Sequence, residues 1–224
     1  MKSTFLYLLA FVSVLGLVSG PRGAEISGRI TADGASRAPL EAEDLEHVVV
    51  AWIPADAAKA PAQPTATMET RGKAFAPRVL AITPGTTVEF PNFDPILHNV
   101  FSMSKAASFD AGLYGEGESR SHTFGEPGVV RVYCNVHQSM VGFILILPTP
   151  HVTRPGPDGS FVLVGLPEGA GTLRVWSERS DIWERELTAG AAGVEAALMV
   201  KRRRLPSHRD KDGKSYRRRG ERDY

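Results

Sequence analysis

The sequence predicts an all-β protein made of two small β-sandwiches, and three observations support this prediction. Short apolar runs alternate with Gly, Pro, Asn and Asp over residues 25–200, as in sandwiches and barrels. The same residues show almost no apolar repeat with the 3.6-residue period of an amphipathic helix. Turn signals, TPG at 83–85 and EPG at 126–128, precede two of the apolar runs. We therefore expect strands joined by tight turns.

The first residues are expected to be a leader rather than a strand. Lys2 is followed by a 14-residue apolar run, residues 5–18, and then by small residues up to Ala24, which is the pattern of a secretory signal peptide. The run is shorter than the roughly 20 residues that a membrane-spanning helix needs. We expect residues 1–24 to be a cleaved signal peptide and the protein to be periplasmic or extracellular.

The middle of the chain contains the clearest strand patterns. The expected strands are residues 86–90, 99–103, 121–124, 129–134 and 142–147. Each is short and rich in β-branched or aromatic side chains. The Ala, Pro and Thr-rich stretch between Pro54 and Met68 is expected to be an extended, exposed linker. Residues 109–114, FDAGLY, are expected to form a loop over the end of the domain.

Two stretches that flank this middle region are expected to pair with each other. GRITADG and VVVAWIP lie within residues 25–60, and DGSFVLVGLPEGAGTLRVW lies within residues 151–198. In this order they resemble the carboxypeptidase regulatory-like β-sandwich. The resemblance implies one sandwich split by an inserted domain, residues 64–148. Two consecutive sandwiches are the alternative.

The charge is unevenly spread along the chain. Residues 25–200 hold 13 Lys or Arg against 21 Asp or Glu, a net charge of −8, whereas residues 201–224 hold 11 against 4, a net charge of +7. The basic tail has few apolar residues and is expected to be disordered. It suits an anionic membrane surface or an acidic protein partner, and a tail that is merely solvated is the alternative. Because the protein is expected to be exported, we expect no nucleic-acid partner.

The sequence contains a single cysteine, Cys134, within the pattern C-x-x-H-x-x-M that also includes His137 and Met140. In an oxidising compartment an odd cysteine suggests intermolecular pairing, a reactive thiol or a metal ligand. A thiolate, an imidazole and a thioether on one loop lack one imidazole of a blue-copper ligand set, and His98 can supply it. Zinc could occupy the same donors. A buried cysteine with no ligand role is the structural alternative.

Residues 68–147 resemble a cupredoxin of the plastocyanin and amicyanin type. The resemblance is carried by AITPGTTVEFPN, by HNV at 98–100 and by FGEPGVVRVYCNVHQSMVGFILI. It implies that one type 1 copper ion is held strongly by His98, Cys134 and His137 and weakly by Met140. It also implies that Asn99 lies behind these ligands, with its backbone amide toward the sulfur and its side chain joining the two ligand loops.

One departure from this resemblance concerns the residues beside the loop histidine. Proline is common there in amicyanin-like loops, whereas this chain has Val136 and Gln138. An extra backbone amide could therefore reach the sulfur, and the expected result is a better stabilised Cu(II) and a lower potential.

The resemblance implies an electron carrier with transient redox partners. An enzyme is not expected, because Cys134 is flanked by Tyr133 and Asn135 rather than by histidines, and the sequence contains no His-x-His pair. The alternatives are a carbohydrate-binding, protein-binding or scaffolding protein without redox activity, and a copper-storage or copper-chaperone protein. FDAGLY also resembles a segment of methylamine-utilisation-like proteins, which identifies no redox partner.

Overall fold

A computed structural model describes residues 23–56, 60–62, 64–202 and 211 of the 224-residue chain. The expected signal peptide, residues 1–24, lies almost entirely outside the described residues, as does most of the basic tail. No helix in the described part of the chain is both long and apolar enough to cross a bilayer.

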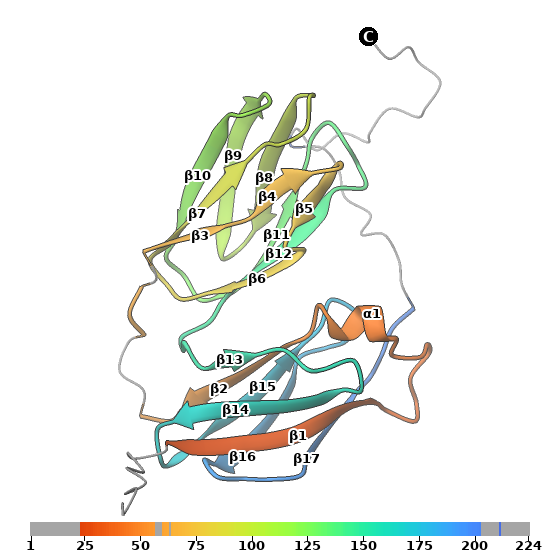
Figure 1. Ribbon diagram of the computed structural model, residues 1–224, viewed down its shortest axis with the longest axis vertical. Coiled ribbons are helices and arrows are strands. Elements are labelled where there is room, and N and C mark those ends of the chain that lie inside the picture. The colour runs from red at the N-terminus through yellow and green to blue at the C-terminus, as the bar shows by residue number, and fades with distance from the viewer. Residues whose placement is uncertain (1–22, 57–59, 63, 203–210, 212–224) are drawn as a thin grey trace, which may run out of the picture.

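The structure is all-β apart from one short helix, which confirms the predicted fold class, and the strands gather into two halves (Figure 1). The strands of the upper half are β3 (Thr65–Thr67), β4 (Glu69–Arg71), β5 (Ala74–Ala76), β6 (Val79–Ile82), β7 (Thr86–Pro91), β8 (His98–Ser104), β9 (Ala107–Tyr114), β10 (Ser119–Phe124), β11 (Gly128–Tyr133) and β12 (Val141–Ile146). Sheets β10-β7-β3 and β6-β12-β11-β8-β9 face each other, and β4 and β5 form a separate hairpin.

The lower half contains strands from both sides of this central region. Its elements are β1 (Ala24–Ala32), α1 (Ala42–Leu45), β2 (Val49–Pro54), β13 (Val152–Thr153), β14 (Ser160–Leu166), β15 (Ala170–Trp176), β16 (Trp183–Thr188) and β17 (Val194–Leu198). They form sheets in the order β14-β1-β17 and β13-β2-β15-β16. We call this half the outer sandwich.

The pairing of the outer sandwich joins distant parts of the sequence. Strand β1 lies between β14, antiparallel, and β17, parallel. Strand β2 pairs with β15 and with β13, where Ala51 faces Val152. The chain thus leaves the outer sandwich after β2 and re-enters it at β13. On this pairing we propose the division in which residues 25–60 and 151–198 form one domain and residues 64–148 are inserted.

Each half has its own apolar core, and a third cluster joins them. Trp52 is fully buried in the outer sandwich, and Phe90 is fully buried between the sheets of the upper half. The joining cluster includes Tyr133 and Phe143 from the upper half and Trp176 from the outer sandwich. The rings of Phe143 and Trp176 are 5.2 Å apart between centroids. Burial of these large rings is a major source of favourable packing energy between the halves.

Two local expectations are wrong. FDAGLY lies in strand β9 and pairs antiparallel with β8 rather than forming a loop. The stretch expected to be an exposed linker contains β3, which adds a parallel edge strand beside β7, and its Ala60 is buried. Strand β9 contains no β-branched residue, and its pairing with β8 compensates for this. The five strands expected in the middle of the chain are confirmed, with ends that differ by one or two residues.

Candidate metal centre

Two neighbouring strands of the five-stranded sheet position the predicted ligands. His98 is the first residue of β8, and Cys134 directly follows β11. Strands β8 and β11 pair antiparallel, with Phe101 opposite Tyr133, so the start of one lies beside the end of the other. The loop from β11 to β12 then carries His137 and Met140. Residues 36 positions apart in the chain therefore meet at one end of the upper half.

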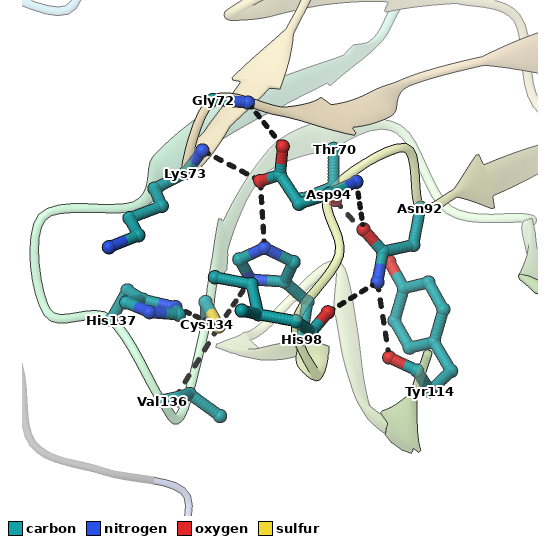
Figure 2. A network of polar contacts seen from close by, with 11 residues as sticks. Thr70, Gly72, Lys73, Asn92, Asp94, His98, Tyr114, Cys134, Val136 and His137 are labelled. Atoms are coloured by element: carbon teal, nitrogen blue, oxygen red, sulfur yellow. Dashed lines mark hydrogen bonds and ion pairs between the residues drawn. The ribbon is translucent and has the colours of Figure 1, made fainter. Parts of the chain in front are cut away.

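The donor atoms of three predicted ligands converge. The sulfur of Cys134 lies 3.7 Å from Nδ1 of His98 and 3.9 Å from Nδ1 of His137. All three ligand atoms lie within 4.8 Å of one another, and Figure 2 shows the two rings on either side of the sulfur. One thiol and two imidazole nitrogens aimed at one point fit the donor preference of copper.

The site is closed from solvent on most sides. His98 and Cys134 are completely buried, whereas His137 is partly exposed. Met140 is also buried, in the same apolar core as Cys134. Its backbone N–H donates to the carbonyl of His137 at 3.0 Å, and its carbonyl accepts from the N–H of Cys134 at 3.4 Å. These bonds close the loop into a compact turn that holds the thiol and the loop imidazole together.

A buried carboxylate holds the other side of the His98 ring. Nε2 of His98 lies 2.9 Å from Oδ2 of Asp94, so the ring contacts an acid on one edge and the thiol on the other (Figure 2). With the proton on Nε2, the ring donates to the carboxylate and leaves the lone pair of Nδ1 directed at the cluster. A carboxylate behind a ligand histidine fixes the ring and raises its basicity as a ligand.

The carboxylate of Asp94 is held by the turn of the β4–β5 hairpin. The backbone N–H groups of Gly72 and Lys73 donate to its two oxygens at 2.6 and 2.8 Å. Both turn residues have positive φ, 60° and 59°, as the tight turns of two-residue hairpins require. That conformation is uncommon for a residue with a side chain, and here it directs two successive amides at one carboxylate.

The hydrogen bonds to Asp94 also decide its charge. Burial works to raise the pKa of Asp94, but the hydrogen bonds from Lys73, Gly72 and His98 outweigh it, and the pKa is lowered from its ordinary value. The carboxyl group is therefore ionised at neutral pH. A negative charge consequently lies on the far side of the His98 ring.

Asn92 connects this carboxylate to the rest of the domain. Its side-chain oxygen accepts from the backbone N–H of Asp94 at 2.9 Å, and its amide donates to the carbonyls of Ile96 and Tyr114 at 2.9 and 3.3 Å (Figure 2). The hydroxyl of Tyr114 lies 3.4 Å from that of Thr70. The loop between β7 and β8 is thereby fixed to both β4 and β9.

The ring of His137, on the loop from β11 to β12, has different surroundings from the ring of His98. Burial lowers the pKa of His137 from its ordinary value, and His98 and Lys73 lower it further. The neutral ring is therefore favoured. Neutral imidazole is the form that binds metal.

Comparison with known proteins agrees with this donor set. Residues 63–147 match the family model for copper-binding proteins of the plastocyanin/azurin family. Residues 63–147 are a cupredoxin domain. The cofactor of this domain is one copper ion. No match was found among curated proteins.

Three of the solved structures that match each cover about two fifths of this chain. A purple cupredoxin from Nitrosopumilus maritimus is 26% identical with a TM-score of 0.33, covering 38% of this chain and 100% of that one. A reduced variant of amicyanin is 22% identical with a TM-score of 0.36, covering 42% of this chain and 96% of that one. A copper-containing nitrite reductase from Thermus scotoductus is 31% identical with a TM-score of 0.36, covering 42% of this chain and 25% of that one.

Asn99 joins the two ligand loops of the cupredoxin domain through its side chain. Its Oδ1 accepts from the backbone N–H of Asn135 at 3.2 Å, and its Nδ2 donates to Asp110 at 2.6 Å and to the carbonyl of Gly112 at 3.2 Å. The side chain of Asn99 therefore links β8 both to β9 and to the loop that follows Cys134. The backbone N–H of Val136 donates to the sulfur of Cys134 at 3.4 Å.

Sequence reasoning did not identify Asp94 or the turn that holds it. The hairpin turn is more than 20 residues before Asp94 in the chain, and no spacing motif links them. A signal was nevertheless present, because an aspartate four residues before a candidate ligand histidine is a plausible hydrogen-bond partner for its second nitrogen.

Proposed function

We propose that this protein is a one-electron carrier whose copper ion is held by His98, Cys134 and His137, with Met140 as the weak axial ligand. The observation that carries the proposal is the convergence of two imidazole nitrogens and one thiol within 4.8 Å in a largely buried pocket. Copper bound to such donors supplies a Cu(I)/Cu(II) couple for transfer of one electron.

The protein's own groups would keep this site rigid and dry. Asp94 fixes the ring of His98 through Nε2, the Asn99 side chain fixes the two ligand loops to each other, and the apolar core excludes water from Cys134. Ligands held in this way need not rearrange when the charge of the site changes. A preorganised polar environment of this kind lowers the cost of moving charge.

Burial favours a carrier over an enzyme. A metal enzyme keeps a coordination position open for water or substrate, whereas His98, Cys134 and Met140 are each at most 1% exposed. His137 is the partly exposed member of the proposed ligand set. Its ring offers an electron a route to the surface.

The surface near His137 suits brief contact with another protein. Phe93, Leu97 and Val136, all on loops next to the proposed ligands, are 45%, 54% and 47% exposed. Small apolar patches of this kind support the small, transient interfaces of redox partners. We propose that the protein is exported and exchanges electrons with such partners outside the cytoplasm, as the leader-like residues 1–24 suggest.

Visible absorption of the copper-loaded protein tests the proposal. The wild type should show an intense thiolate-to-copper band, and Cys134→Ser should abolish it because the sulfur is the source of the band. His122→Gln, which changes a histidine outside the cluster, should leave it intact. A wild-type protein that binds copper without this band, or a band that survives Cys134→Ser, would refute the proposed ligand set.

A further inference from the structure

A large cleft lies between the cupredoxin domain and the outer sandwich, away from the proposed copper ligands. Its volume is ≈ 1540 Å³, and its walls include Arg131 and Phe143 from the cupredoxin domain and Arg37, His47 and Arg202 from the outer sandwich side. Typical small-molecule pockets hold about 300–1,000 Å³. The size of this cleft is better matched to a segment of polypeptide than to a compact ligand.

Several charges that line the cleft are already neutralised within the protein. The guanidinium of Arg78 donates to both oxygens of Glu178, at 3.0 and 2.7 Å, which joins the two halves across the cleft. Arg179 forms a buried ion pair with Asp44. Lys201 pairs with Asp181. These ion pairs hold the walls of the cleft together. Other positively charged residues of the cleft are not part of them.

Three arginines of the cleft have no such partner. Arg37, Arg131 and Arg202 line it, are exposed, and form no ion pair with any described residue. They come from three elements: the loop after β1, strand β11, and the segment after β17. The lining also contains the carboxylates of Glu43 and Glu178, but its six Lys or Arg outnumber them, so the groove is locally cationic in a region that is acidic as a whole.

The spacing of these three arginines indicates which chemical class of ligand the cleft would bind. A single phosphate is usually held by several donors that converge on one point, such as a run of backbone amides. Here the unpaired guanidiniums are on separate elements of two halves, with apolar Phe143 and Met199 also lining the cleft. Spaced cations with apolar surface between them match an extended chain that carries several carboxylates.

The basic tail is a poor occupant of this groove. Residues 203–224 carry nine Lys or Arg against four Asp or Glu, so they have the same sign of charge as the cleft. A flat membrane surface also does not enter a concave site. We propose that the cleft binds an acidic segment of a partner protein, through Arg37, Arg131 and Arg202. This inference does not depend on copper, because the three arginines are not among the proposed ligands.

Binding of a fluorescent ten-residue polyglutamate to the copper-free, full-length protein tests the proposal. In about 0.15 M salt, where charges beyond roughly 8 Å are screened, the wild type should bind the peptide. Arg37→Gln/Arg131→Gln/Arg202→Gln should weaken binding about tenfold or more, the product of three partly exposed ion pairs. Thermal unfolding should be little changed, because all three side chains are exposed.

The matched control removes three charges from the tail instead. Arg217→Gln/Arg218→Gln/Arg219→Gln lowers the net charge equally and should change the affinity less than about twofold, within the range of screened charges. Peptide-induced changes in the amide NMR signals of Arg37, Arg131 and Met199 should locate the binding.

Three results would overturn the proposal. The first is no binding of the peptide to the wild type. The second is an equal loss in the tail and cleft variants, which would place the peptide on the tail. The third is displacement of the peptide by inorganic tripolyphosphate at far lower concentration, which would indicate a phosphate site. If the triple variant does not fold, Arg131→Gln alone, on the cupredoxin side, must still weaken binding.

Discussion

The two halves of the molecule bury polar side chains in different ways. The cupredoxin domain buries a hydrogen-bonded set, Asn92, Asp94 and His98, which ends on the thiol of Cys134 at the proposed copper site. The outer sandwich instead buries the ion pair of Asp44 with Arg179 and, next to it, Ser177, whose hydroxyl accepts from the backbone N–H of Arg179 at 3.2 Å. The difference shows that buried polar side chains can either position the residues of a site or stabilise the fold. The hydrogen-bond partners of the buried groups show which of these two roles each group has.

The largest expected effect comes from breaking the ion pair of the outer sandwich. Arg179→Met removes the guanidinium from a buried carboxylate and should lower the free energy of unfolding by about 3–5 kcal/mol. Arg174→Gln, which disrupts the exposed pair with Glu184, should cost about 0–1 kcal/mol. Urea unfolding measures both. Equal losses would mean that the buried pair contributes no more than a surface pair.

A smaller effect, confined to copper, is expected at Asp94. Asp94→Asn keeps the size of the side chain but removes the charge behind His98, so copper affinity should fall about 10–100-fold. Competition with a chelator measures it, and the position of the thiolate band reports whether the ligand geometry has changed. Asp158→Asn, on an exposed loop of the outer sandwich, is the control. Unchanged affinity in Asp94→Asn would mean that the carboxylate only packs against the ring.

The amide on the sulfur provides a finer test of the copper site. Val136→Pro removes the N–H that lies 3.4 Å from Sγ of Cys134, whereas Gln138→Pro leaves it in place. A hydrogen bond of about 1 kcal/mol corresponds to roughly 40 mV for one electron. Voltammetry should show a potential lower by about this amount in Val136→Pro than in Gln138→Pro.

From the sequence we expected an extra backbone amide at the sulfur to lower the reduction potential, and the direction predicted here is the opposite. A donor N–H places positive charge near the thiolate and withdraws electron density from it, which disfavours Cu(II) relative to Cu(I). The extra amide should therefore raise the potential rather than lower it. A higher potential in Val136→Pro would restore the original expectation.

The smallest expected effect is on pH dependence and concerns His47, at the cleft. Burial lowers the pKa of His47; Glu178 opposes this, and Arg78 and Arg154 add to it. Because the unfolded chain then binds the proton more readily, this contribution to stability is complete above pH 6.5 and is lost as pH falls through the lower folded pKa.

One partly buried histidine in each half contributes to the change of stability with pH. His47→Gln should flatten the loss of unfolding free energy between about pH 7 and 5. His122→Gln, which removes a ring stacked on Phe109 in the cupredoxin domain with a pKa also lowered by burial, should likewise flatten this loss. An unchanged slope in His47→Gln would show that this histidine is solvated in both states.

Much of the fold could be predicted from local sequence, and the exceptions have a physical cause. The five central strands carry dense β-branched and aromatic residues, so their pattern was sufficient. Strand β9 was missed because it contains Asp110 and Gly112, the latter with a positive φ, and it exists through pairing with β8. An edge strand that depends on its neighbour leaves little trace in its own residues.

The proposed copper site, like the fold, could be predicted from the sequence only in part. Cys134, His137 and Met140 lie within seven residues and could be predicted together, and His98 was added as the imidazole that completes the ligand set. Asp94 could not be assigned in this way, because its role depends on the two amides of the turn at 72–73. Backbone groups carry no residue identity, so only the fold shows where they point.

The side-by-side placement of β2 and β13 has a consequence for how such a protein can be modified. Trp52 and Thr149 are bonded to each other, side-chain hydroxyl to carbonyl, at 2.7 Å, so the exit and return of the chain lie together at the cupredoxin boundary. A short turn could connect β2 directly to β13. A different domain whose two ends lie close together could also be inserted at the same point. The outer sandwich would then keep its own strand pairing while carrying a different domain.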